Sequence, residues 1–361
     1  MARLTVIESN LFGEHGHYAE FVRSLASCTS PEDELIVLCD EALPDAVLAE
    51  APRVRVERPF RLVGRQREER RVLRECLERP DPFLLLTARH TDVLRLEGAA
   101  RATGIDPAHA RLYFHWRESG LVERLAIAAC MRVRRHARAI APTEETAGFL
   151  RRTGWRSVEC IPYPVRPADR DASPSTFRHL LVAGAVRMNK GIEHVAAALP
   201  MLAARVPCPP VLVQTTGKRR GGVSGRRESA ALESLRACGY PALRMDPEAP
   251  DARAYAQRFH GAVTLTPYDP SKFADNVSGV ALDALLHGSP VVATAGTWQA
   301  GLVERYGAGR VMSSWTAAAL ADAAGACIED WDRVSAAARE AARELAKAHH
   351  PAALVRSLMR A

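Results

Sequence analysis

The 361-residue chain lacks the patterns that mark several large classes of protein. No apolar run approaches the ~18 residues that a membrane-spanning helix needs, and no apolar signal segment precedes the strand-like LTVIES at residues 4–9. The eight cysteines are scattered singly, without CxxC or another metal-binding spacing, which is typical of reduced thiols in a cytoplasmic protein. We therefore expect a cytoplasmic protein, and any contact with the inner face of a membrane is expected to be peripheral.

Several catalytic signatures are also missing. The chain contains no GxSxG, HExxH or P-loop sequence, and the segment after LTVIES does not supply the GxGxxG of a nicotinamide dehydrogenase. No set of serine, histidine and aspartate has the spacing of a nucleophile elbow, and no metal-ligand set is evident. We expect neither a metal nor a bound cofactor.

Lysine is scarce, since only four of the 49 basic residues are lysines. Basic residues exceed acidic ones by seven. Up to Val165 there are 25 basic and 24 acidic residues, and after it 24 basic and 18 acidic ones, so most of the excess lies in the second half. A domain that binds a nucleotide diphosphate carries such an excess. No dense basic stripe with interleaved aromatic residues occurs, so a nucleic-acid partner is not expected.

The length favours two domains of roughly 150 to 200 residues, and 47% apolar with 25% charged residues is ordinary for a globular protein. Short apolar runs alternate with segments of helical period, which predicts parallel sheets covered on both faces. Expected strands in the first half are 4–7, 35–38, 54–56, 83–86, 112–114, 139–140 and 158–161, with helices at 17–28, 66–79, 90–103 and 120–136. The alternation stops in the proline-rich stretch 161–177, which is the predicted linker.

After the linker the pattern restarts, with strands expected at 179–183, 211–214, 262–265 and 291–293 and helices at 192–204 and 228–238. The loop TGKRRGGVSGRR, residues 216–227, is either a mobile flap over a ligand or a solvated loop. Thr143 is expected to cap a helix that ends at Gly154. The pair His349 and His350 is expected to lie on the surface.

The segment DNVSGVALDALLHGSPVVAT places Asp275 and Asp283 around a predicted helix that begins near Val277. A helix N-terminus is an anion site, so a phosphate is expected there. Gly288 is expected to end the helix, and Val291–Ala293 to form a buried parallel strand. In the alternative interpretation, Asp275 is only the N-cap and Asp283 a solvated position.

A second motif, LLVAGAVRMNKGIEHVAAAL, delivers Arg187 and Lys190 into a loop ahead of Gly191 and an amphipathic helix. Two cations beside a helix N-terminus suit a diphosphate, because charge-assisted hydrogen bonds to phosphate are strong. Both motifs follow strands of the same predicted sheet, so both are expected at one edge of it. The alternative is that both cations are solvated loop residues.

The first of these segments resembles the signature of the family-4 retaining glycosyltransferases of the GT-B fold. In that signature two glutamates separated by seven residues precede a small residue, Gly, x, Pro, Val, Val; both glutamates are aspartates here. The resemblance implies that Asp275 binds hydroxyls of the donor sugar and that Asp283 binds the ribose. It also places the residues at the helix start against the donor, namely Ser278, Gly279 and Val280.

The same resemblance implies roles for other loops. Lys190, by its place before Gly191, matches the lysine that neutralises the donor diphosphate, and Arg187 takes the role of the family's arginine. In the first domain, SNLFGEHGHYAEF is similar to the glycine-rich first loop of the family, so Gly16 is expected to approach the transferring phosphate.

Histidines and one tyrosine complete the candidate residues. His115, at the predicted carboxyl end of a strand, is implied as a donor-sugar contact, with a hydrogen-bonded histidine that touches no ligand as the equal alternative. His15 and His17 are either ligand contacts or residues of a helix start. Tyr268 is expected to form a wall of the site.

The sequence thus predicts an α/β protein of GT-B architecture, with two Rossmann-like doubly wound domains facing a central cleft. Residues 1–160 are the expected acceptor domain, 161–177 the linker and 178–345 the donor domain, while 346–361 form a helix expected to pack on the first domain.

The predicted activity is metal-independent, retaining transfer of a sugar from a nucleotide-diphosphate sugar, such as a UDP- or GDP-sugar. The acceptor is a hydroxyl of a glycan, a lipid-linked or a small molecule, in bacterial polysaccharide or glycoconjugate synthesis. A nucleotide-sugar epimerase of the same fold and a non-catalytic GT-B binding subunit remain as alternatives.

Overall fold

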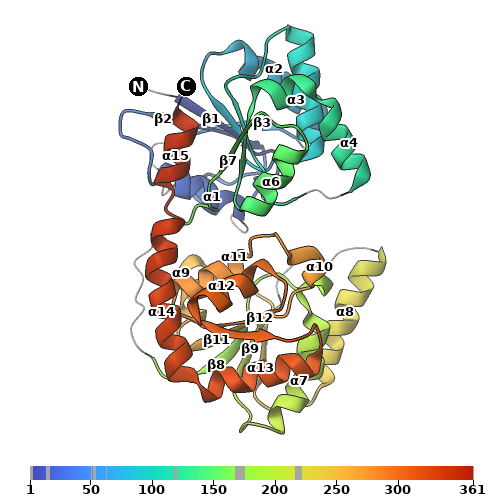
Figure 1. Ribbon diagram of the computed structural model, residues 1–361, viewed down its shortest axis with the longest axis vertical. Helices are drawn as coiled ribbons and strands as arrows, with labels where there is room; N and C mark the ends of the chain where they lie inside the picture. Colours follow the sequence, from blue (N-terminus) through green and yellow to red (C-terminus); the bar gives the residue numbers. More distant parts are fainter. Residues whose placement is uncertain are drawn as a thin grey trace. The chain divides into compact units, whose positions relative to one another are not determined.

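The computed structural model describes residues 3–13, 17–49, 51, 54–61, 63–117, 120–166, 175–215 and 222–360. The chain divides into two units, which are treated separately below. Unit 1 comprises Met1–Ala168 and Ala348–Ala361, and unit 2 comprises Asp169–Lys347 (Figure 1). Part of the predicted linker, residues 167–174, lies outside the described residues.

Unit 1 is built on a seven-stranded sheet whose described strand pairs are all parallel. The spatial order is β3-β2-β1-β4-β5-β6-β7, so the chain reverses direction across the sheet between β1 and β4. The strands are β1 (Arg3–Ile7), β2 (Glu34–Asp40), β3 (Val54–Phe60), β4 (Phe83–Leu85), β5 (Ala110–Tyr113), β6 (Arg138–Ala141) and β7 (Ser157–Cys160).

Helices cover both faces of this sheet, and each face has its own apolar core. One face packs against α1 (His17–Ala26), the 3-10 helix η1 (Asp45–Leu48) and α15 (Ala352–Met359). The other packs against α2 (Arg65–Glu78), α3 (His90–Thr103), α4 (Leu121–Ala129), α5 (Met131–His136) and α6 (Glu144–Arg152). The central strands are buried on both sides, which explains why they appear in the sequence as short continuous apolar runs.

Unit 2 repeats this plan with six strands in the order β10-β9-β8-β11-β12-β13, again with parallel pairs. The strands are β8 (His179–Val182), β9 (Val211–Gln214), β10 (Leu243–Asp246), β11 (Ala262–Thr266), β12 (Val291–Thr294) and β13 (Gly309–Met312). The predicted α/β class with two doubly wound parallel sheets is therefore confirmed.

The helices of unit 2 also lie on both faces of its sheet (Figure 1). One layer contains α7 (Ile192–Ala203), α8 (Gly222–Ala237) and α13 (Ala317–Glu329), which pack side by side. The remaining elements are η2 (Met188–Lys190), α9 (Ala252–Arg258), α10 (Pro270–Phe273), α11 (Gly279–Leu286), α12 (Trp298–Tyr306) and α14 (Trp331–Ala348).

Local sequence signals correctly predicted two helix ends, the start of α6 and the end of α11. The Thr143 hydroxyl accepts a hydrogen bond from the Thr146 amide at 3.2 Å and caps α6, as predicted. After α11, Gly288 adopts a left-handed φ of 70°, and the Ser289 amide bonds back to the Ala284 carbonyl at 2.9 Å. This is the glycine-terminated helix end expected at that position.

The single helix predicted over 120–136 is wrong, because the chain breaks at Cys130 into α4 and α5. The cause lies in α3, where the buried Glu97 carboxylate accepts a hydrogen bond from the Val133 amide at 3.0 Å. That contact satisfies an amide at the start of α5, as a cap would. A tertiary partner of this kind leaves no local mark in the sequence.

Two further expectations are corrected. Residues 222–227, predicted as part of a loop, form the first turns of α8, which packs against α7 and η2 despite its glycines. His349, predicted on the surface, is 7% exposed, and its Nδ1 lies 2.8 Å from the Tyr163 carbonyl oxygen, while His350 is exposed. Burial and that hydrogen bond fix His349 in the short segment between the end of α14 and the start of α15.

The C-terminal helix α15 belongs to unit 1. Leu354, Val355 and Leu358 are buried in the same core as β1 and β2. The Arg111 guanidinium donates to the Arg360 carbonyl at 2.9 Å, and the Ser357 hydroxyl donates to Glu159 at 2.6 Å. The last helix therefore completes one face of the first sheet.

Candidate functional site

The strand order places the candidate site of unit 2 at the reversal point of its sheet. In sheets of this topology, ligands bind beyond the carboxyl ends of the strands where the order reverses. In unit 2 those strands are β8 and β11. The cationic loop follows β8, and the segment with the two aspartates follows β11, so both motifs lie at that edge.

The loop after β8 is held by backbone contacts to its neighbours. Gly184, with φ of 82°, donates its amide to the Gln214 side chain at the end of β9, at 3.0 Å. Gly191 has φ of 72°, and a Cβ there would collide with the Pro267 carbonyl oxygen beyond β11. The Asp269 amide bonds to the Asn189 carbonyl at 2.9 Å. These contacts tie the loop of Lys190 to the strand ends on both sides.

Residues from both motifs, together with Tyr268, converge near Gly184. A Cβ on Gly184 would lie 3.1 Å from a methyl carbon of Val280 and 3.4 Å from Lys190 Nζ. The Lys190 ammonium lies 5.5 Å from the ring centroid of the buried Tyr268. Among the described residues Lys190 forms no ion pair, so its charge is not balanced by a carboxylate. The structure thus brings Lys190 to the beginning of α11.

The N-terminus of α11 is capped by Ser278, whose hydroxyl accepts a hydrogen bond from the Ala281 amide at 3.2 Å. The alternative in which Asp275 is the N-cap is therefore wrong. Asp275 is half-buried in the segment between α10 and α11, three residues before the cap. Gly279 is exposed, and a Cβ there would meet nothing within 4 Å. The first residue of α11 thus has open space on its side-chain side, at a helix N-terminus of the kind that binds anions.

Asp283 is held by a half-buried tyrosine that the sequence analysis did not identify. The Tyr255 hydroxyl on α9 donates to Asp283 Oδ2 at 3.0 Å. Burial and the neighbouring carboxylate raise the pKa of Tyr255 well above its ordinary value, so the hydroxyl stays protonated. Asp283 is half-buried rather than freely solvated, which contradicts the alternative of a merely solvated position.

Arg187 has a carboxylate partner that was also missed. Its Nη1 lies 3.9 Å from Glu228 Oε2 and donates to the Val186 carbonyl at 2.8 Å. Glu228 is 9% exposed and lies on α8, within the part of the chain where a helix was predicted. The charge of Arg187 is thus partly balanced, whereas that of Lys190 is not.

In unit 1, Gly16 and His15 lie outside the described residues, as does the side chain of His17. His115 is 7% exposed, and its Nε2 lies 2.9 Å from the Leu86 carbonyl oxygen. Its ring packs edge-on against Phe21 and Tyr113. This hydrogen-bonded aromatic environment is the one expected of a structural histidine, and it stands at the carboxyl end of β5.

The sequence analysis also missed Glu8, which follows β1 at the reversal point of the unit 1 sheet. Glu8 is 3% exposed and accepts hydrogen bonds from the Asn10 amide at 3.0 Å and from its side chain at 3.2 Å. Burial raises the pKa of Glu8 to about 7. A carboxyl directly after a buried strand is the signal that would have identified it.

Two searches of the described ranges gave negative results. No three His, Cys, Asp or Glu side chains there are grouped so that they would hold a metal ion. None of the helices in that part of the chain combines the length and the apolar character needed to cross a bilayer.

Comparisons with known proteins identify the fold. No protein-family model and no curated protein matches the sequence, but the structure is similar to solved GT-B glycosyltransferases. HepE from Anabaena, solved with UDP-glucose, matches with a TM-score of 0.74 at 15% identity, over 99% of this chain and 98% of HepE. Sucrose-phosphate synthase from Thermosynechococcus elongatus matches with a TM-score of 0.71 at 15% identity, over 99% and 97%.

A third similar structure is WaaG, a glycosyltransferase involved in lipopolysaccharide biosynthesis. It matches with a TM-score of 0.68 at 15% identity, over 99% of this chain and 100% of WaaG. At this level of identity the likeness shows the fold, and the predicted GT-B fold is confirmed.

Proposed function

We propose that this chain is a retaining, metal-independent glycosyltransferase that moves a sugar from a nucleotide-diphosphate sugar to an acceptor hydroxyl. The observation that carries the proposal is the convergence of Lys190 with the first turn of α11 at the reversal point of unit 2. A lysine without an ion pair beside a helix N-terminus is an arrangement that binds a diphosphate.

In this proposal the positive groups stabilise the departing diphosphate, as a metal would in other enzymes. Lys190 and the amides of Gly279 and Val280 contact the phosphates. Arg187 contacts both the phosphates and its carboxylate partner Glu228. The departing nucleoside diphosphate accepts the proton of the acceptor hydroxyl, so no separate protein base is needed.

The two aspartates hold the rest of the donor in this proposal. Asp283, held by Tyr255, accepts from the ribose hydroxyls, and Asp275 accepts from hydroxyls of the sugar. The similarity to HepE, solved with UDP-glucose, supports a nucleotide-sugar donor.

A panel of ligands tests the proposal directly. UDP, GDP, ADP and TDP, each alone and as common nucleotide sugars, are compared by thermal shift, because a ligand that binds only the folded state raises the melting temperature. One nucleoside diphosphate and its sugars are expected to raise it. NMR of that donor should then show consumption only when an acceptor is present, with retained anomeric configuration. Conversion of the donor without any acceptor would identify an epimerase instead.

Substituting Asp283 by Asn tests the ribose contact. The amide oxygen still accepts from Tyr255, so stability is expected to change little, while donor affinity measured by calorimetry falls on the order of tenfold because charge-assisted hydrogen bonds are lost. Asp332→Asn, an exposed aspartate at the start of α14, is the matched control. Equal donor affinity in Asp283→Asn and the control would contradict the assigned role.

We also propose that the acceptor is a glycan or lipid-linked molecule of bacterial polysaccharide synthesis, and that contact with a membrane is peripheral. Leu121, Val122 and Leu125 on α4 are 70%, 74% and 61% exposed, and the exposed Arg124 lies among them. Exposed apolar side chains beside arginine suit an anionic bilayer surface. We expect the protein to sediment with anionic vesicles. This binding should be lost in Val122→Ser and kept in Arg356→Gln, which changes an exposed residue of α15.

A further inference from the structure

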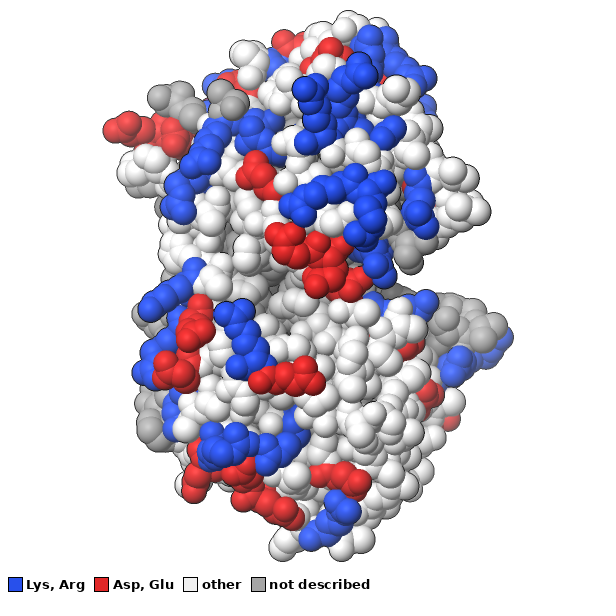
Figure 2. Space-filling model, viewed as in Figure 1, with Lys and Arg blue, Asp and Glu red and all other residues white. Residues whose placement is uncertain are grey.

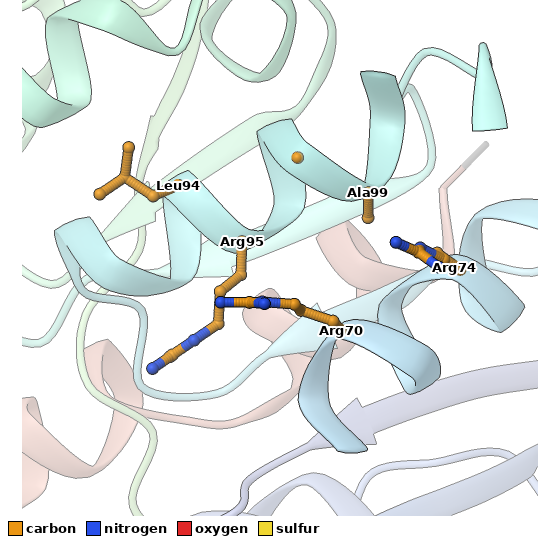
Figure 3. Close-up of a pocket in the computed structure, with 6 residues that line it drawn as sticks. Arg70, Arg74, Leu94, Arg95 and Ala99 are labelled. Atoms are coloured by element: carbon orange, nitrogen blue, oxygen red, sulfur yellow. The ribbon is translucent and has the colours of Figure 1, made fainter. Parts of the chain in front are cut away.

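A groove of about 350 Å³ opens on unit 1, away from the residues assigned above, between α2 and α3 (Figure 3). Two arginines of α2 line one side, and one stripe of α3 lines the other. The lining residues are Arg70, Arg74, Leu94, Arg95, Gly98 and Ala99. In Figure 3 the side chains of Arg70 and Arg95 extend into the same gap from opposite helices, and Arg74 points toward Ala99.

The two groove-lining arginines of α2 carry charges that no described carboxylate balances. Arg70 and Arg74 are exposed, stand one turn apart on the same face of the helix, and form no ion pair with any described residue. Arg71 on the same helix differs, since it pairs with Glu68 at 2.9 Å and with Glu75 at 2.6 Å. Arg70 and Arg74 therefore bring two unpaired charges to the side of α2 that faces the groove.

Arg95 contributes donors rather than net charge. It lies 3.2 Å from Glu69 and 2.8 Å from Asp92, and its side chain is 20% exposed. Two carboxylates fix its position at the bottom of the groove. A guanidinium offers five N–H donors, and those not used by the carboxylates remain for a ligand.

The opposite wall is shaped by a glycine and an exposed leucine. A Cβ on Gly98 would meet no atom within 4 Å, so the missing side chain leaves open space in the groove. Leu94, one turn earlier, is 44% exposed and forms an apolar edge. Figure 2 shows Lys and Arg side chains grouped on one face of unit 1.

We propose that this groove binds a phosphate monoester, with Arg70 and Arg74 as its principal ligands. Arginine binds phosphate bidentately, and a dianion neutralises the two charges that the fold leaves unbalanced. The apolar edge at Leu94 accommodates the organic part of the ester. Two unbalanced cations in a small groove fit a single phosphate group and not a polymer backbone, which needs a row of contacts.

The test uses pyrophosphate and glycerol phosphate as probes with the full chain, measured by calorimetry. Lys190→Ala is used as the background, so that the donor site of unit 2 contributes little diphosphate binding. The double variant Arg70→Gln, Arg74→Gln is expected to weaken binding roughly tenfold or more. Arg67→Gln, an exposed arginine of α2 that does not line the groove, is the matched control and should bind as the background does.

A second variant fills the groove without changing its charge. Gly98→Leu replaces an open helical glycine, so the fold is expected to be kept, and glycerol phosphate binding should weaken to a similar extent. Arginine Nε–Hε resonances of Arg70 and Arg74 should shift on addition of either probe. Unchanged affinity in both the double variant and Gly98→Leu would overturn the proposal, whatever the outcome at the donor site.

The source of the phosphate is decided by a parallel experiment with vesicles. Phosphatidylcholine vesicles with and without phosphatidic acid are sedimented with the same variants. If the double variant loses binding to phosphatidic acid vesicles and Arg67→Gln does not, the phosphate belongs to a lipid. If only the soluble probes distinguish the two variants, the ligand is a soluble phosphate ester.

Discussion

At the scale of single residues, Lys190 is set apart by its surroundings. Its ammonium group faces the ring of Tyr268 and the open position at Gly184, and no described carboxylate pairs with it. Replacing Lys190 by Ala is expected to weaken nucleoside-diphosphate binding by roughly 1.5 to 3 kcal/mol, the contribution of a charge-assisted hydrogen bond. Isothermal titration calorimetry with the diphosphate found in the ligand panel measures the loss.

Lys347→Ala is the control for that substitution, because Lys347 is an exposed lysine at the end of α14. It removes the same charge from the chain and should leave the affinity unchanged. Equal affinities of the two variants would refute the phosphate assignment of Lys190.

Glu8 is expected to make the stability of unit 1 depend on pH. Its folded pKa of about 7 lies above the ordinary value of 4.5, so the folded state retains a proton that the unfolded chain releases. The resulting stabilisation is complete below pH 4.5 and is lost as the pH rises through about 7. Glu8→Gln, which mimics the protonated form, should therefore be more stable than the parent at pH 8 by up to about 3 kcal/mol.

Urea unfolding at a series of pH values between 5 and 8 checks this expectation. The difference between Glu8→Gln and the parent should be small at pH 5 and grow with pH. Exposed Glu32→Gln should show no such trend. A constant difference across the series would mean that Glu8 is already ionised at pH 5.

At the scale of elements, the loop after β8 depends on a glycine that no other residue replaces. Gly191 has a left-handed φ of 72°, and a Cβ there would collide with the Pro267 carbonyl oxygen. Gly191→Ala is expected to reduce the free energy of unfolding of unit 2 by about 1–3 kcal/mol from backbone strain alone. Donor affinity should fall with it, because the loop positions Lys190.

Gly279→Ala provides the contrast, since Gly279 begins α11 and a Cβ there meets nothing within 4 Å. Its melting temperature should equal or exceed that of the parent, because alanine favours the helix. Calorimetric melting of both variants distinguishes strain at one glycine from a general effect of adding a methyl group. Similar melting temperatures for the two variants would contradict the strain argument.

At the scale of the whole molecule, the last helix belongs to the first unit although it follows the second in sequence. Leu358 on α15 is fully buried in the core that contains β1 and β2. Leu358→Ala is expected to reduce the stability of unit 1 by about 2–5 kcal/mol, as for other buried leucines. Hydrogen exchange should show faster exchange in β1 and β2 and unchanged exchange in β11 and β12.

Arg356→Ala, an exposed residue of the same helix, is the control and should leave both units unchanged. Faster exchange in β11 and β12 of Leu358→Ala would show that the two units do not unfold independently.

The sequence by itself determined the class of fold and the position of the candidate donor site. Buried parallel strands require continuous apolar runs, and helices that cover them require apolar stripes, so the alternation was visible in the chain. Lys190 was identified by its place before Gly191, because loop glycines have local chemical requirements. The cap of α11 was not, since the sequence offered Asp275 as the N-cap and the structure has Ser278 there.

Only the tertiary structure decided which charges are balanced. The partners of Arg187, Asp283 and Val133 are Glu228, Tyr255 and Glu97, each from a different helix. The same holds for the buried His349, whose ring is hydrogen-bonded to the carbonyl of the distant Tyr163. Local propensity carries no information on contacts between residues far apart in the chain, although burial and such contacts determine whether a charged side chain is neutralised or left to bind a ligand.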